Sequence, residues 1–336
     1  MESKRTGPRG DRGKLIIVIS LVLATLFVAL ALILNSGICA ENLSTRETTD
    51  SSDVSLTIQQ VDRETREAMR AANRIEESQE PSDAIDNFTA SFDAVSVAVA
   101  NERALRGQAL DMSQSEPSDG FTLQQDNATR NYTDASGTPD WKLANDVERM
   151  AGVRFNVERD HLLNTDELDD IEEDAFNVEF DDGGEEWFVF MHREDDTVVI
   201  TAANGSELNV LGLIDEIDDL TGYDDEDCKV DAESVEVDFA AGTVDGKPCT
   251  ALAYDEDLSE NLTISFNNGD KGGGTYLILV DTAVEDIEGD FNDPTQSPFK
   301  NGAVFDATVE VTFERSDVRY STSRNVTAEP LAYEAD

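Results

Sequence analysis

Histidine, a common acid–base group in catalysis at neutral pH, occurs only twice in this chain, as His161 and His192. The two lie far apart in the sequence, and neither belongs to a cysteine or glutamate pattern with the spacing of zinc ligands. No serine stands with either in a recognisable triad motif. The sequence therefore predicts no catalytic group, and we expect a protein that is not an enzyme.

Two acidic runs, Asp224–Cys228 and Asp286–Asp293, offer the oxygen ligands that Ca²⁺ prefers. Neither run has the spacing of an EF-hand loop with its terminal glutamate. In a chain with 73 acidic residues, such runs arise without a cation. We expect neither a metal nor any other cofactor.

The three cysteines are Cys39, Cys228 and Cys249. The second and third bracket a short segment, and an extracellular location permits a disulfide between them, with two buried thiols as the alternative. Cys39 is then left as a free thiol, a lipidation site or an intermolecular bridge.

Seven asparagines stand in N-x-Ser/Thr sequons, mostly in stretches rich in turn formers. Asparagine, serine and threonine also abound in polar loops without any glycan. Because all seven follow the apolar run described below, they favour a glycosylated surface protein. The candidates are Asn42, Asn87, Asn127, Asn131, Asn204, Asn261 and Asn325.

The 73 acidic and 25 basic residues give a formal net charge of −48. At 1 M salt the Debye length falls to about 3 Å, so only neighbouring charges still repel. The carboxylates are interleaved with regular apolar patterns, which is similar to proteins of extreme halophiles and unlike a disordered acidic tail. Nucleic acid is a poor partner for such a surface, and we expect none.

The elements that carry these residues begin with an uncharged apolar run from Leu15 to Leu34. As a helix it spans about 30 Å, the thickness of a bilayer core. The following Ile38-Cys39-Ala40 is not a small-x-small cleavage motif. Basic residues precede the run and acidic residues follow it. We therefore expect this helix to cross the cell membrane once and to contact its lipid. The N-terminus is then cytoplasmic and the C-terminal part extracellular.

Two helical patterns follow the span, at residues 54–75 and 85–99, with Pro81 between them. An antiparallel helical hairpin is the expected arrangement, with a continuous rod or pairing with another subunit as alternatives. Residues 116–140 lack any period and are rich in turn formers, which indicates a linker.

From Trp141 the apolar residues alternate with period two, which predicts about eight to ten strands. The pattern includes a central strand at GTYLILVD, a final hairpin turning at Ser316-Asp317, and a glycine-rich hairpin turn at residues 267–275. A short helix is expected near residues 208–220. The absence of regular crossover helices favours an antiparallel β-sandwich.

The expected fold class is thus α+β, with an N-terminal transmembrane helix, a helical hairpin or stalk, and a C-terminal antiparallel β-sandwich. The expected boundaries are 1–14 for a cytoplasmic basic leader, 15–37 for the transmembrane or stem helix, 38–115 for an extracellular helical stalk, 116–140 for the linker and 141–336 for the sandwich.

The segment RGDRGKLIIV, residues 9–18, resembles the class III signal of archaeal type IV pilin-like proteins. Two further segments are also similar to uncharacterised pilin-like surface proteins of haloarchaea, which carry a β-rich C-terminal domain. They are LALILNSGICAENLSTRE and NNGDKGGGTYLILV. The resemblance implies that a class III signal peptidase cuts between Gly13 and Lys14. It also implies that the apolar stem can pack against other pilin-like subunits. The stem departs from many pilins in having no glutamate five positions after the cut.

The sequence as a whole favours a membrane-anchored, glycosylated cell-surface protein with a structural or adhesion role. One such role is that of a minor subunit of a type IV pilin-like filament. The alternative is a fixed membrane-anchored module that binds a glycan or another envelope protein.

Overall fold

The computed structural model describes residues 53–74, 80–115, 117–205, 220–253, 261–293, 296–316 and 318–328. The chain divides into two units, Met1–Gln60 and Val61–Asp336. The predicted span at 15–34 and almost all of the helix predicted at 208–220 lie outside the described residues. Within the described ranges, no helix combines the length and apolar character needed to cross a membrane.

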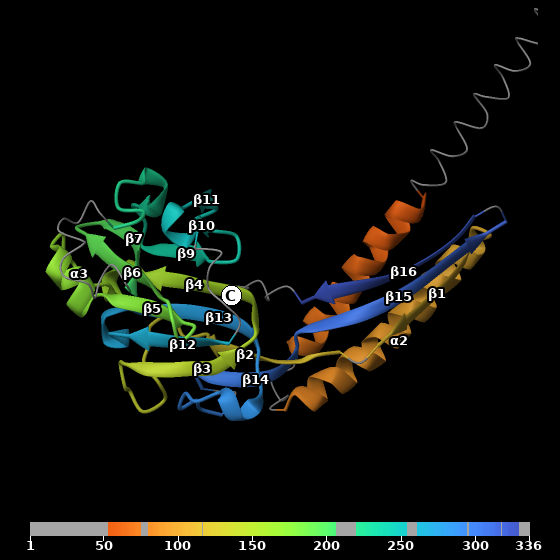
Figure 1. Ribbon diagram of the computed structural model, residues 1–336, viewed down its shortest axis with the longest axis horizontal. Helices are drawn as coiled ribbons and strands as arrows, with labels where there is room; N and C mark the ends of the chain where they lie inside the picture. The colour runs from red at the N-terminus through yellow and green to blue at the C-terminus, as the bar shows by residue number, and fades with distance from the viewer. Residues whose placement is uncertain are drawn as a thin grey trace, which may run out of the picture. The chain divides into compact units, whose positions relative to one another are not determined.

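The second unit is mostly antiparallel β-structure in three sheets (Figure 1). The largest sheet has seven strands in the order β11-β10-β9-β4-β13-β2-β14. Their bounds are Lys247–Pro248, Thr243–Val244, Ser234–Asp238, Arg149–Glu158, Gly274–Asp281, Asp119–Gln125 and Phe299–Val304.

The second sheet has six strands in the order β3-β12-β5-β6-β7-β8. Their bounds are Trp141–Val147, Leu262–Asn267, Phe176–Asp181, Glu186–Glu194, Thr197–Asn204 and Lys229–Val230. Short helical turns connect the strands of these two sheets: α3 at Leu168–Asp174, η1 at Arg159–His161, η3 at Glu226–Cys228, η4 at Thr250–Leu252, η5 at Gly269–Lys271 and η6 at Val284–Asp286.

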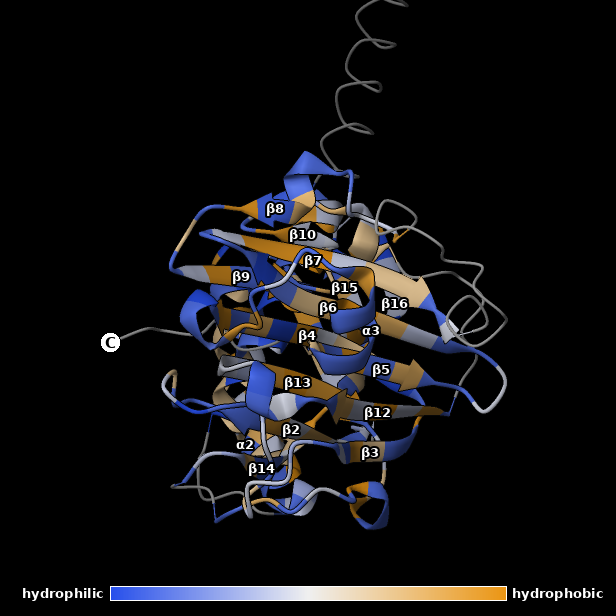
Figure 2. Ribbon diagram, turned by 90° about the vertical axis from the view of Figure 1, so that its left-hand side faces the viewer, coloured by the Kyte–Doolittle hydropathy of each residue, from blue (hydrophilic) through white to orange (hydrophobic). Residues whose placement is uncertain are grey.

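The period-two pattern of the sequence explains why these two sheets form a sandwich-like domain. Alternate residues of each strand, such as Val153, Phe155 and Val157 of β4, join one buried cluster with the inward residues of the other sheet. Figure 2 shows hydrophobic residues concentrated on the strands and hydrophilic residues on many of the loops. The expectation of an antiparallel β-rich domain is therefore confirmed.

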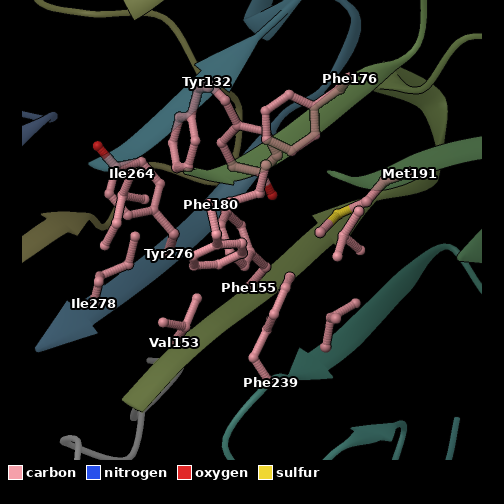
Figure 3. Packing of buried hydrophobic residues seen from close by; sticks show 14 of the residues in the cluster. Tyr132, Val153, Phe155, Phe176, Phe180, Met191, Phe239, Ile264, Tyr276 and Ile278 are labelled. Carbon is pink, nitrogen blue, oxygen red and sulfur yellow. The ribbon is translucent and has the colours of Figure 1, made fainter. Parts of the chain in front are cut away.

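Tyr132 lies in the aromatic part of this core, although it falls in the segment that we predicted to be a linker. Its ring centre is 4.6 Å from that of Phe176 and 5.6 Å from that of Phe155. Figure 3 shows these rings gathered with Tyr276. The segment also contributes β2, which pairs with β13 and β14. The linker prediction for 116–140 is thus wrong for these residues, because turn formers flank a buried strand and one buried aromatic side chain.

The third sheet has the order β1-β15-β16, with bounds Ala109–Gln114, Asp306–Arg315 and Val318–Thr327. The predicted final hairpin exists, since Arg315 pairs with Val318. It lies in this third sheet and not in the sandwich as predicted. The third sheet also takes β1 from the segment 38–115 that we expected to be wholly helical. Pairing partners far away in sequence decided both assignments.

Helix α2, Pro81–Leu105, contacts β1, β2 and β14. Glu80 is extended and Pro81 occupies the first turn, so the predicted break and restart are confirmed. Residues 53–73 are also helical, and Figure 1 shows their portion from residue 61 onward running opposite to α2. Asn73, at the end of that helix, donates to the Val304 carbonyl at 3.0 Å and accepts from the Val304 amide at 2.8 Å.

The glycine-rich segment does not form the predicted hairpin turn, because β12 and β13 belong to different sheets. The chain crosses here from one sheet to the other through very narrow space. A Cβ on Gly272 would lie 2.6 Å from the Phe176 ring, and one on Gly274, at φ +136°, would lie 2.1 Å from the Asn156 carbonyl oxygen. Only glycine combines this backbone angle with this close approach.

Candidate functional site

The predicted cleavage site, Gly13 and Lys14, lies outside the described residues. The same holds for Cys39 and for the sequon at Asn42. Their roles stay predictions.

Cys228 and Cys249 form the predicted disulfide, with an S–S distance of 2.05 Å. Both residues are buried, at 0% and 3% exposure. Cys228 immediately precedes β8, at one edge of the six-stranded sheet, and Cys249 immediately follows β11, at one edge of the seven-stranded sheet. The disulfide therefore joins the two layers of the sandwich along one side.

The acidic run Asp224–Cys228 supports this covalent link. One carboxylate oxygen of Asp225 accepts from the Asp227 amide at 3.1 Å. The other accepts from the Thr250 amide at 3.1 Å and the Thr250 hydroxyl at 2.9 Å. The two backbone hydrogen bonds, from Asp227 and Thr250, lower the pKa of Asp225. Asp225 thus connects the two short turns that carry the cysteines.

Three sequon asparagines are exposed: Asn127, Asn261 and Asn325. The side-chain oxygen of Asn127 accepts from the Thr129 amide and hydroxyl, so these two hydrogen bonds do not occupy its amide nitrogen. Asn261 stands just before β12 with φ +76°. The amide of Asn325 instead donates to Asp306 at 3.1 Å. Attachment of a glycan requires an accessible amide nitrogen, so Asn127 and Asn261 are the best-placed acceptors among the described sequons.

Asn131 is less suited to modification. It is half-buried, its amide donates to the Asp270 carbonyl at 2.9 Å, and its oxygen lies 2.8 Å from Nδ1 of His161. Asn87 and Asn204 are also half-buried, the first within α2 and the second at the end of β7. Tertiary structure therefore separates sequons that are equivalent in the sequence.

One cluster of carboxylates escaped the sequence analysis: Glu179, Asp181 and Glu186, whose ligand atoms lie within 4.8 Å of one another. Asp181 and Glu186 face each other across β5 and β6. Burial, and then the charges of Glu179 and Asp181, raise the pKa of Glu186. Strand pairing brought these residues together, and no local spacing indicated it.

The two histidines serve no common site. His161 contacts Asn131, whereas His192 is fully buried on β6 and neither ring nitrogen has a hydrogen-bond partner among the described residues. Burial, with a smaller contribution from Lys229, lowers the pKa of His192 to about 4. The ring is therefore neutral at neutral pH.

Both tryptophans contribute to the sandwich core. Trp141 is buried and donates to the Tyr132 carbonyl at 3.0 Å. Trp187 is half-buried and lines an apolar pocket of about 50 Å³ with Phe180, Phe239 and Met150. This pocket has room for a small apolar group only.

A polar junction joins the sandwich to the third sheet, where β14 runs directly into β15. Asp306, the first residue of β15, accepts from Ser118 at 2.7 Å and from Asn325, and forms an ion pair with Arg149. Arg149 also pairs with Asp281 at the end of β13 and lies over the Phe305 ring. Although burial raises the pKa of Asp306, hydrogen bonds from Ser118, Arg149 and Asn325 lower it overall.

Comparison with known proteins adds no relative: no family model, no curated protein and no solved structure matches this chain.

Proposed function

We propose that this chain is a single-span, N-glycosylated cell-surface protein of an extreme halophile with a structural or adhesion role, acting as a minor subunit of a type IV pilin-like filament. The N-terminal segment RGDRGKLIIV supports membrane anchoring and processing. The net charge of −48 supports the assignment to an extreme halophile.

One structural observation carries the mechanical part of the proposal. Two neighbouring strand pairs continue from the sandwich into the third sheet: β2 pairs with β14, and the adjoining β1 pairs with β15. The Asp306–Arg149 ion pair closes the junction. A sandwich coupled in this way to a sheet that α2 contacts is suited to a structural or adhesion role.

Mass spectrometry of the mature N-terminus, on protein from native membranes, tests the processing claim. We expect a chain that begins at Lys14, and a Gly13→Val variant that keeps Met1 and migrates more slowly on a gel. A wild-type chain that keeps Met1, or one that begins after residue 37, would contradict the pilin-like proposal.

Glycopeptide mapping of the same protein tests the surface location. We expect glycans on Asn127 and Asn261, because both side chains are exposed. Asn131 serves as the internal control, since its amide is held by Asp270. Glycan on Asn131 alone, or on none of the seven sequons, contradicts this part of the proposal.

A second candidate function is a fixed anchored binding module, in which the apolar pocket beside Trp187 receives one small apolar group of a glycan or of another envelope protein. Shearing of cells separates the two functions. Release of the protein in sedimentable filaments supports the filament role, whereas retention in the membrane fraction with ligand binding that a Trp187→Ala variant loses supports the module.

A further inference from the structure

Three buried polar atoms in and beside the sandwich core have no hydrogen-bond partner among the described residues. They are Oε1 of Gln125, Nε of Arg130 and the hydroxyl of Tyr276. Gln125 is 0% exposed and Tyr276 is 2% exposed. Buried polar groups are almost always hydrogen-bonded, either within the protein or to ordered water, so three such atoms from adjoining segments indicate a bound group.

The contacts of Gln125 bring these segments together. Gln125, at the end of β2, lies directly opposite Tyr276 on β13, and opposite residues point to the same face of a sheet. Tyr276 belongs to the buried cluster between the two sheets, so Gln125 also points inward. Its Nε2 donates to the carbonyls of Gly274 at 2.8 Å and Arg130 at 3.1 Å. Burial raises the pKa of Tyr276 and the positive charge of Arg130 opposes this, which places the guanidinium near the hydroxyl.

Other contacts hold each of the three groups, so none turns to bond another directly. Nε2 of Gln125 donates to three backbone carbonyls. The reversed amide would point its oxygen at those carbonyl oxygens, so the position of Oε1 is fixed. Nη2 of Arg130 donates to the Asp134 carbonyl. The Tyr276 ring packs edge-on against Phe266, with the ring centres 5.2 Å apart.

The three atoms differ in the hydrogen bonds that they offer. Nε of Arg130 only donates, Oε1 of Gln125 only accepts, and the Tyr276 hydroxyl does either. A cation at their centre would be repelled by the guanidinium, and a halide has no hydrogen to donate to Oε1. Water fits all three atoms, because it accepts and donates hydrogen bonds at once.

We propose that Gln125, Arg130 and Tyr276 form a binding site for one structural water molecule. The water accepts from Nε of Arg130, donates to Oε1 of Gln125 and bonds the Tyr276 hydroxyl, which gives it the three hydrogen bonds that are typical of a buried water. Arg130 stands between the sequons at Asn127 and Asn131. The water therefore ties the segment that carries these sequons to the two central strands β2 and β13.

A crystal structure of the full chain in detergent, grown from KBr at a resolution that shows ordered water, tests the site. We expect one density peak within about 2.5–3.2 Å of all three atoms, the range of hydrogen bonds, and no anomalous signal from bromine there. A bromide signal at this position would assign the site to a halide and overturn the proposal. The absence of any peak would overturn it as well.

Nuclear Overhauser measurements on the full chain in detergent, with isotope-labelled glutamine, give a readout in solution. The amide hydrogens of Gln125 should contact a water that stays bound far longer than surface water. Gln124 is the matched control, because it is half-buried and points to the opposite face of β2. Contacts with long-lived water that are equal at the two glutamines would contradict the proposal.

Tyr276→Phe removes one of the three partners and keeps the shape of the ring. It should weaken the contact between Gln125 and the long-lived water by about twofold or more, because the water keeps only two of its hydrogen bonds. Tyr132→Phe is the control variant, since the Tyr132 hydroxyl donates to the Asn156 carbonyl at 3.4 Å, and it should leave the contact unchanged. An unchanged contact in Tyr276→Phe, or an equal loss in both variants, would contradict the site.

Discussion

His192 illustrates how much a single buried residue can contribute to the pH dependence of stability without taking part in any site. Its ring packs inside the β6–β7 region with both nitrogens lacking hydrogen-bond partners among the described residues, and Thr201 on β7 has an equally unpartnered buried hydroxyl. Lys229 is the charged group that adds to the lowering of the His192 pKa. Burial without a hydrogen-bond partner strongly disfavours the charged imidazolium, so the folded state favours the neutral imidazole.

The folded-state pKa of about 4 for His192 lies below the value of about 6.5 for an unfolded histidine. Between these values the unfolded chain binds a proton that the folded chain does not. Stability should therefore fall as pH falls from 6.5 to 4, by about 3 kcal/mol in total. Denaturant unfolding at a series of pH values measures the effect.

A His192→Leu variant should lose most of this slope, because leucine cannot take up the proton. His161→Gln serves as the control, since His161 is only half-buried, and it should retain the slope. If wild type and His192→Leu show the same dependence between pH 6.5 and 4, the buried histidine is not its cause.

At the scale of elements, the contacts that matter most join one sheet to another. The disulfide joins the edges of the two sandwich sheets, and the Asp306 junction joins the sandwich to the third sheet. Gly302 lets the start of α2 approach β14, since a Cβ there would lie 2.3 Å from the nitrogen of Pro81. These contacts hold together elements that are far apart in sequence.

Removal of the disulfide by Cys228→Ala, Cys249→Ala should destabilise the fold by about 3 kcal/mol, the entropy of closing a loop of this length in the unfolded chain. Equilibrium unfolding with and without reductant measures it. With Cys39→Ser as the common background, the double variant should respond to neither reductant nor oxidant, which makes it its own control. A loss well below 1 kcal/mol would show that strand pairing alone holds this side of the sandwich.

An Asp306→Ala substitution should destabilise the fold by about 2 kcal/mol. Hydrogen bonds to a charged group contribute about 1.5–3 kcal/mol. The ion pair with Arg149 contributes less than a buried pair would, because the Arg149 side chain is exposed to solvent. The lowered pKa of Asp306 means that this contribution is present above the unfolded value of about 3.9 and is lost as pH falls through the folded value. Thermal unfolding at pH 7 and at pH 3 measures both effects.

Asp270→Ala is the matched control, because Asp270 forms an exposed ion pair with Lys271. Exposed pairs contribute about 0–1 kcal/mol. Equal losses from the two alanine variants would contradict the role assigned to the junction.

At the scale of the whole molecule, we expect the net charge of −48 to lower stability through self-repulsion. The core is built from alternate residues of two facing sheets. The attraction that stabilises this core is short-ranged, whereas the repulsion acts over the Debye length and depends on salt.

The midpoint of urea unfolding should therefore rise steeply between 0.1 M and 1 M KCl, as screening shortens the Debye length from about 10 Å to about 3 Å. An equal osmolality of sucrose is the control, because it strengthens burial without screening charge. A midpoint that rises equally in sucrose, or that falls with KCl, would show that charge repulsion does not control the stability of the fold.

Local patterns of the chain were sufficient for the elements whose period is regular. The alternation that begins at Trp141 correctly predicted strands, among them β4, β5, β9 and β12. The apolar segment GTYLILVD correctly predicted a central strand, β13, which lies between β4 and β2. Spacing also predicted the Cys228–Cys249 disulfide.

The tertiary structure alone decided which strands share a sheet. Pairing energy depends on partners far away in sequence, so β2 could not be recognised among turn formers, and the glycine-rich segment between β12 and β13 could not be told from a hairpin turn. Strand pairing also brought the carboxylates of Glu179, Asp181 and Glu186 together, which no local pattern indicated. By itself the sequence determined the charge, the apolar run, the sequons and the strand periods, because these are local, whereas exposure of each sequon and the grouping of buried polar atoms around Tyr276 depended on what the fold placed beside them.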